Sequence, residues 1–187
     1  QTKSLLTEAE LVNTALPGGM GGVPVVNQTI SLVEYFDKVY VGTLTNELKP
    51  YEEIYYENDN LKISYSSIRK GHGLKDFCKV ETQELKKIIN DISPDFIIAN
   101  FTVEYALAAI NSKIPHVIIV HDHPWHILKT QKFHPYWILR FCLSLYIYLK
   151  GQSFLAVNNY VGNFTKYFTQ KKVNVLGNPL RKEFFQP

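Results

Sequence analysis

The residues best suited to chemistry are three histidines that follow an apolar run, in the stretch VIIVHDHPWHI at 117–127. Imidazole nitrogens bind transition metals, and they also orient or protonate substrates near neutral pH. Either His121, His123 and His126 are metal ligands, or His121 alone faces a ligand where a strand ends. Asp122 lies between the first two histidines and is a further candidate for ligand binding.

A zinc site requires three or four ligands that converge. The H-x-H-x-x-H spacing resembles that of the metallo-β-lactamase-like hydrolases, in which an Asp stands immediately before the last histidine. This chain has Trp125 at that position, and His134 is the only histidine further along. We therefore expect no resident metal and keep a zinc hydrolase as a third alternative.

A glycine-rich turn, LPGGMGGVP at 16–24, lies between a predicted strand and a predicted helix. Glycines there allow a tight bend and a close approach to a ligand, and the N-terminus of the helix favours an anion. The turn is not a dinucleotide fingerprint, because Pro24 replaces the third glycine, and it is not a phosphate loop. Gly21 and Gly22 are candidate ligand-binding residues, with a plain turn as the alternative.

Strand and helix patterns alternate along the chain. After a first strand ahead of the glycine turn, we predict strands at 38–44, 61–68, 95–100, 116–121, 153–158 and 172–177. Helices are predicted at 23–36, 79–92, 102–113, 136–150 and 159–168, and a loop at 46–60. Ser93-Pro94 should end the second of these helices, and Gly151 should be the C-cap of the fourth.

Apolar strands that alternate with helices predict an α/β fold with a doubly wound, mostly parallel, Rossmann-like sheet. Ligands bind outside the carboxyl ends of the strands in such sheets. This rule places four features at one edge: the glycine turn at 18–22, Asn100, the histidine cluster at 121–126, and Asn158-Asn159.

Length and composition set broad limits on function. The 187 residues suit one domain or one lobe, and a net charge of +3 gives no reason to expect a nucleic-acid partner. Cys78 and Cys142 lie far apart, which argues against a disulfide framework and favours a reducing compartment such as the cytoplasm. We expect Cys142, in an apolar helix, to lie in the core.

The apolar run YWILRFCLSLYIYL at 136–149 is too short to span a bilayer. The basic residues that flank or interrupt it are Lys129, Lys132, Arg140 and Lys150. A helix packed on the sheet is the favoured interpretation, because the polar residues lack a clear helical period. The alternative is an interfacial helix within 129–150 that makes peripheral contact with anionic headgroups.

Four pieces of the sequence resemble, in order, the N-terminal domain of family 4 glycosyltransferases, which are retaining nucleotide-sugar enzymes of the two-lobed GT-B architecture. The pieces are LPGGMGGVP, PDFIIANFTVEYALAAINSKIPHVIIVHD, FLAVNNYVGNF and VNVLGNPLRKEFFQP. The resemblance covers nearly the whole chain.

The resemblance implies roles for individual residues. Gly21 and Gly22 would approach the donor phosphates and the acceptor. His121 would contact the transferred sugar, orienting it and stabilising charge rather than attacking it. Asn100 stands where these enzymes commonly have histidine and Asn158 where they commonly have serine, so both are candidate acceptor contacts that depart from the pattern.

The resemblance also implies a domain organisation. Residues 1–177 would form the acceptor-side lobe, and residues 178–187 would begin the crossover to a missing donor-binding lobe. A hexosyltransferase of this kind would use a nucleotide sugar and a glycan or lipid-linked acceptor in polysaccharide or glycoconjugate synthesis. It would act in the cytoplasm, with peripheral contact at the inner face of the membrane, and this chain alone would be inactive. A non-catalytic module that binds a sugar or nucleotide is the alternative.

Overall fold

The chain divides into two compact units. Unit 1 comprises Gln1–His72 and Pro179–Pro187, and unit 2 comprises Gly73–Asn178. The computed structural model describes residues 2–5, 32, 35–45, 52–57, 61–67, 78–100 and 103–176. The single lobe over 1–177 stays a prediction, and the crossover predicted at 178–187 lies outside the described residues.

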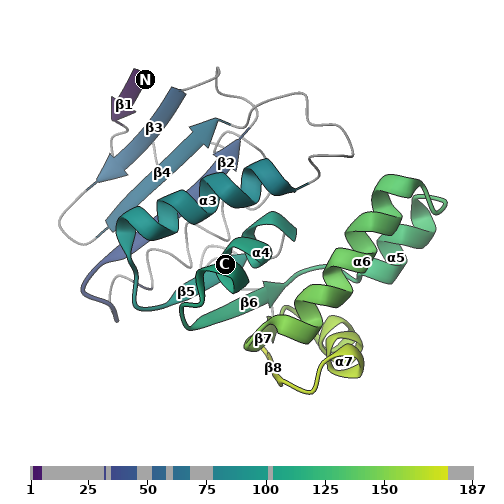
Figure 1. The fold of residues 1–187 in the computed structure, drawn as a ribbon. Helices are drawn as coiled ribbons and strands as arrows, with labels where there is room; N and C mark the ends of the chain where they lie inside the picture. The colour runs from purple at the N-terminus through teal and green to yellow at the C-terminus, as the bar shows by residue number, and fades with distance from the viewer. Residues whose placement is uncertain are drawn as a thin grey trace, which may run out of the picture. The chain divides into compact units, whose positions relative to one another are not determined.

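Unit 1 contains a mixed four-stranded sheet (Figure 1). Its strands, in spatial order, are β1 (Thr2–Leu5), β3 (Glu52–Glu57), β4 (Leu61–Ser67) and β2 (Val39–Thr45). The pairs β1–β3 and β2–β4 are parallel, whereas β3 and β4 are antiparallel. The strands predicted at 38–44 and 61–68 are confirmed.

Strand β3 corrects one prediction. It lies within residues 46–60, which we expected to form a loop because they are polar and irregular. Ile54, Tyr55 and Tyr56 are residue types that favour strands, and they outweigh the flanking glutamates. Only residues 58–60 separate β3 from β4, whereas a parallel crossover requires a dozen or more. This sheet is therefore mixed, because β3 and β4 form an antiparallel pair beside the two parallel pairs.

Unit 2 contains a parallel four-stranded sheet flanked by helices, an α/β arrangement compatible with a Rossmann-like fold. Its strands are β5 (Ile97–Asn100), β6 (His116–Val120), β7 (Ser153–Ala156) and β8 (Lys172–Val175). Its helices are α3 (Lys79–Ile92), α4 (Val103–Ser112), α5 (Pro124–Thr130), α6 (Pro135–Lys150) and α7 (Asn159–Phe168). All four predicted strands and four predicted helices of this region are confirmed.

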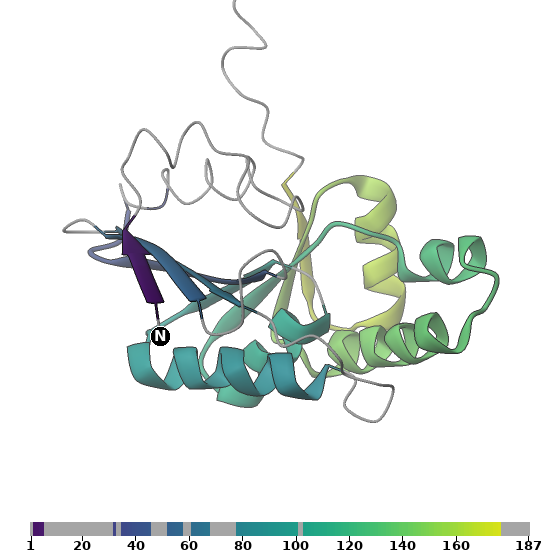
Figure 2. The ribbon, with the colours of Figure 1, turned by 90° about the horizontal axis from the view of Figure 1, so that it is seen from above.

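The strands of unit 2 follow one another in chain order, so the strand order does not reverse between β5 and β8. Right-handed crossovers that always step in one direction place their helices on the same face. Accordingly, α4 contacts α6 and α6 contacts α7 (Figure 2). These three crossovers therefore do not place helices on both faces of the sheet, which is what a doubly wound sheet requires.

Helix α5 was not predicted, and the dipeptide His-Pro explains where it begins. Proline at the first helical position has a backbone angle suited to the helix, and the residue before it is extended. His123 precedes Pro124 at the start of α5, and His134 precedes Pro135 at the start of α6. Each histidine ring accepts a hydrogen bond from a backbone N–H of its own helix, so both histidines are N-caps.

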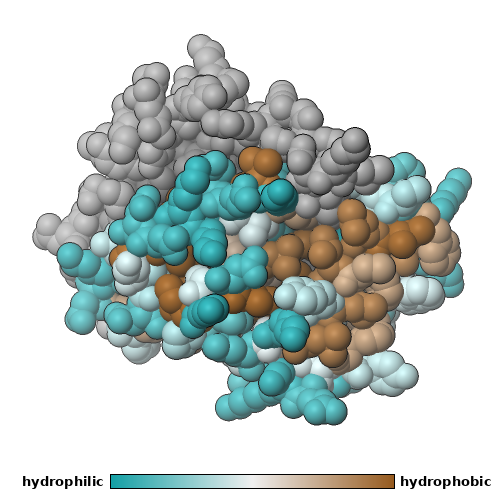
Figure 3. Space-filling view, viewed as in Figure 1, coloured by the Kyte–Doolittle hydropathy of each residue, from teal (hydrophilic) through white to brown (hydrophobic). Residues whose placement is uncertain are grey.

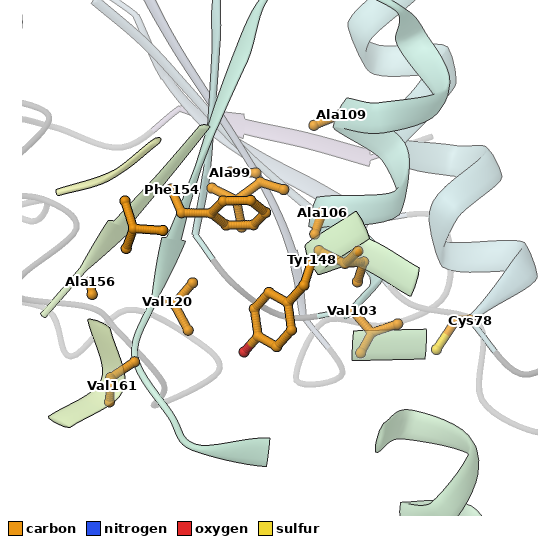
Figure 4. Packing of buried hydrophobic residues seen from close by; sticks show 13 residues of the cluster. Cys78, Ala99, Val103, Ala106, Ala109, Val120, Tyr148, Phe154, Ala156 and Val161 are labelled. Carbon is orange, nitrogen blue, oxygen red and sulfur yellow. The ribbon is translucent and has the colours of Figure 1, made fainter. Parts of the chain in front are cut away.

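The core of unit 2 lies between the sheet and the helices (Figure 4). Every residue of β6 is buried, as expected of a central strand in a parallel sheet. Tyr148 of α6 packs against Phe154 of β7, with ring centroids 5.8 Å apart, and both side chains are fully buried. Alanines of α4, including Ala106 and Ala109, allow that helix to approach the cluster closely.

Gly151 ends α6, as predicted, but for a different reason. We expected a C-cap of the usual glycine kind, which has a left-handed backbone. Its φ of −60° is open to any residue. A side chain is excluded instead by space, because a Cβ atom there would lie 2.6 Å from Cζ of Phe154 and 2.9 Å from Cδ1 of Ile118.

Candidate functional site

Asn100 and His121 meet at the carboxyl edge of the sheet of unit 2. Asn100 is the last residue of β5, and His121 directly follows β6. The two strands are neighbours, and Asn100 is paired with Ile119 in the ladder. The Nε2 atom of His121 lies 3.1 Å from Oδ1 of Asn100, which is a hydrogen-bond distance.

This hydrogen bond defines the form of the imidazole. An amide oxygen only accepts, so Nε2 of His121 carries the hydrogen and donates it, and Nδ1 is the acceptor nitrogen. Burial lowers the pKa of His121, although the nearby Asp122 carboxylate works in the opposite direction. His121 is therefore a neutral imidazole near pH 7, held in one orientation by Asn100.

Asp122 directly follows His121 in the chain, and Asn158 belongs to a neighbouring strand end. Asn158 follows β7, the neighbour of β6, and so belongs to the same edge of the sheet. Its Oδ1 accepts a hydrogen bond from the backbone N–H of Val161 at 2.9 Å, which makes Asn158 the N-cap of α7. Asp122 is exposed to solvent. A ligand-binding role for either residue stays a prediction.

The other two histidines of the cluster, His123 and His126, lie in different surroundings. His123 caps α5, and its ring packs on two aromatic rings of α7, with centroids 4.9 Å from Tyr160 and 3.7 Å from Phe164. Burial lowers the pKa of His123. His126 is exposed, and within the described residues no three His, Cys, Asp or Glu side chains converge as metal ligands. The geometry thus offers the zinc hypothesis no support.

A polar network that the sequence did not predict joins α3, α4 and α6. The Oε1 atom of Glu104 accepts hydrogen bonds from Nη1 of Arg140 at 3.0 Å and from Sγ of Cys78 at 3.1 Å. Arg140 also donates to the hydroxyl of Tyr136 at 3.2 Å. Burial raises the pKa of the Cys78 thiol, and the Glu104 carboxylate adds to this effect, so Cys78 stays a thiol. Arg140 therefore points inward rather than toward an external anion.

Two further predictions about the site have different outcomes. Gly21, Gly22 and the elements around them lie outside the described residues, so their role stays a prediction. Cys142, which we expected in the core, is exposed on α6. The error arose because an apolar helix was assumed to be buried on all sides.

Unit 2 also carries a groove of about 400 Å³ on its helical layer. Residues of α3, α4 and α6 line it, together with Cys78, and none of the predicted site residues does. In the described part of the chain, no helix combines the length and apolar character needed to cross a bilayer.

Comparisons with protein-family models, with curated proteins and with solved structures found no match for this chain.

Proposed function

We propose that the chain is the acceptor-side lobe of a retaining glycosyltransferase that uses a nucleotide sugar, with His121 in contact with the transferred sugar. The observation that carries this proposal is the hydrogen-bonded pair of His121 and Asn100 at the carboxyl edge of a parallel sheet. In open α/β sheets that edge is where ligands bind. The ordered resemblance to family 4 glycosyltransferases supplies the reaction class.

The state of the imidazole suits a role in orientation. Transfer with retention requires a group that holds the sugar and stabilises charge as the bond to the donor breaks. A neutral His121 whose Nε2 hydrogen is donated to Asn100 has an acceptor nitrogen, Nδ1, for a sugar hydroxyl. Asn100 acts in this scheme as a positioning residue, because it selects the tautomer.

A screen of nucleotide sugars for hydrolysis and transfer should use the complete gene product alongside this 187-residue chain. Hydrolysis of one nucleotide sugar by the complete product supports an enzyme. Saturable sugar or nucleotide binding without turnover would instead favour the non-catalytic module.

The residue assignment has its own test. His121→Ala should lower kcat by roughly 10²- to 10³-fold, the usual cost of removing one preorganised charge-stabilising contact. His126→Ala is the matched control, because His126 is an exposed histidine of the same segment and should leave kcat within about threefold. Circular dichroism should show both variants folded. Near-wild-type turnover of folded His121→Ala would refute the assignment.

A further inference from the structure

Helix α6 has apolar residues on two faces, and only one of them is in the core. Ser144, Ile147 and Tyr148 are buried against the rest of unit 2. On the outer side, Ile138 and Leu149 are 42% and 66% exposed. Because they are eleven residues apart, about three helical turns, they lie on the same stripe of the helix.

Aromatic rings extend this exposed stripe onto α5. The ring of Trp125 lies 5.8 Å from that of Phe133 and 5.6 Å from that of Phe141, measured between centroids. Trp125 and Phe133 are each almost half exposed. We name this surface the α5–α6 patch; its members are Trp125, Phe133, Ile138, Phe141, Cys142, Tyr146 and Leu149. Figure 3 shows hydrophobic residues gathered over these two helices.

The sequence segment that carries the α5–α6 patch has formal charges of one sign. Residues 123–182 contain no aspartate and no glutamate. The lysines and arginines among the described residues of this run are Lys129, Lys132, Arg140, Lys150, Lys166, Lys171 and Lys172. Arg140 is turned inward to Glu104. Lys129 lies in the last turn of α5, Lys132 lies between α5 and α6, and Lys150 ends α6; all three are exposed. The patch is thus an apolar surface with cations near both ends of α6.

We propose that the α5–α6 patch is the surface by which this protein lies on an anionic lipid bilayer. Such a bilayer offers phosphate headgroups to the lysines and an acyl boundary to the apolar stripe, and amphipathic helices with basic flanks bind in this way. One face of α6 is held in the core, so the helix lies parallel to the membrane surface. The proposal does not depend on the glycosyltransferase assignment.

The same observations argue against two other occupants. A two-fold symmetric dimer would place the patch against itself. Lys129, Lys132 and Lys150 would then face a second lysine-rich surface, with no carboxylate in 123–182 to offset the repulsion. Nucleic acid would offer phosphates to the lysines. Phosphate contacts would not, however, explain why the apolar side chains of Ile138 and Leu149 are exposed on the same surface.

The test is co-flotation of the full 187-residue chain with vesicles of phosphatidylcholine, with and without phosphatidylglycerol. We expect binding to the anionic vesicles that weakens as salt is added, and little binding to the neutral ones. The emission of Trp125, which is partly exposed, should move to shorter wavelength on binding, and Trp125→Phe should abolish that shift.

Two double variants, each with a matched control, separate the contribution of the lysines from that of the apolar residues. Lys129→Gln with Lys132→Gln should weaken binding about thirtyfold, from the contribution of two lysines near an anionic surface. The control with the same change in charge is Lys86→Gln with Lys87→Gln, both exposed on α3.

Ile138→Ser with Leu149→Ser should weaken binding at least about tenfold, through the loss of apolar contact. Tyr160→Ser with Tyr167→Ser is the control, because these are exposed apolar rings outside the patch. Thermal unfolding should show that all four double variants fold.

Several outcomes would overturn the proposal. These are equal binding to neutral and anionic vesicles, no binding to either, or equal weakening by the patch variants and their controls. Binding of RNA without binding of vesicles would assign the lysines to nucleic acid. A dimer in solution that Ile138→Ser with Leu149→Ser dissociates, together with absent vesicle binding, would assign the patch to self-association.

Discussion

Gly151 joins α6 to β7, and its replacement by alanine should destabilise unit 2 through steric overlap alone. The backbone at Gly151 has a φ of −60°, so alanine meets no conformational penalty there. Its Cβ, however, would lie 2.6 Å from Cζ of Phe154, 2.9 Å from Cδ1 of Ile118 and 3.1 Å from the carbonyl oxygen of Ile147. The substitution therefore isolates the cost of one added methyl group in a closed space.

The magnitude follows from how far the neighbours can move. Optimal carbon–carbon contacts are about 3.5–4.0 Å, so the Phe154 ring would have to retreat by roughly 1 Å. Phe154 and Ile118 are fully buried, and the ring of Phe154 packs against that of Tyr148, with centroids 5.8 Å apart. Overpacking of a core by one methyl group costs about 1–3 kcal/mol, and we expect a value in the upper half of that range.

Urea unfolding followed by circular dichroism would measure this change as a lower midpoint with an unchanged slope. The matched control is Gly162→Ala in α7, where a Cβ would lie 2.8 Å from Cγ2 of Val175. Val175 is partly exposed at the end of β8 and can yield. Alanine also gains about 1 kcal/mol of helix propensity over glycine, so Gly162→Ala should stay within about 1 kcal/mol of wild type.

The comparison between the two glycines decides whether the reasoning holds. Gly151→Ala should be clearly less stable than Gly162→Ala, although both add one methyl group. If Gly151→Ala were as stable as wild type, the junction of α6 and β7 would have more space than the structure gives it. The account of how α6 is positioned on the sheet would then fail.

Three further predictions concern unit 2. Asn158→Ala removes the oxygen that caps α7 at 2.9 Å and should cost about 1 kcal/mol in urea unfolding. Burial lowers the pKa of His121 and of His123, so their contribution to stability should be fully present above about pH 6.5, the unfolded-state value, and should decline as pH falls through their folded-state pKa values. A thiol reagent should label exposed Cys142 in the native protein and spare Cys78, because burial raises the pKa of Cys78.

Each of these three has a control or a contrary result. Asn163→Ala changes an exposed asparagine inside α7 and should not destabilise the protein. A His121→Asn variant should show a flatter decline of stability below pH 6.5, and an identical decline would contradict the role given to burial. Urea should expose both cysteines to the reagent, and rapid native labelling of Cys78 would contradict its place in the core.

Much of unit 2 could be predicted from the sequence, because its signals are local. The apolar runs at 97–99 and 117–120 lie in strands β5 and β6, because β-branched residues such as isoleucine and valine favour strands. Helix α3 begins at Lys79 and ends at Ile92, as the apolar spacing and the following Ser93-Pro94 predicted. The position of Asn100 and His121 at one edge followed from the rule for parallel strands.

The errors arose where the outcome depended on partners distant in sequence. The pattern of β3 alone does not show that it pairs with β4, because pairing and direction depend on the connection and on the neighbouring strand. The packing of His123 on Tyr160 and Phe164 of α7 likewise depends on a helix distant in sequence.

The sequence by itself determined where the strands and helices of unit 2 lie, since hydrophobic period, proline and glycine act within a few residues. Only the tertiary structure decided what each polar side chain is for. Arg140 pairs with Glu104 from another helix, and His121 donates a hydrogen bond to Asn100 at the end of another strand. Gly151 is a glycine because Phe154 and Ile118 occupy the space beside it. Such partners come together only when distant segments pack, so no local pattern could have specified them.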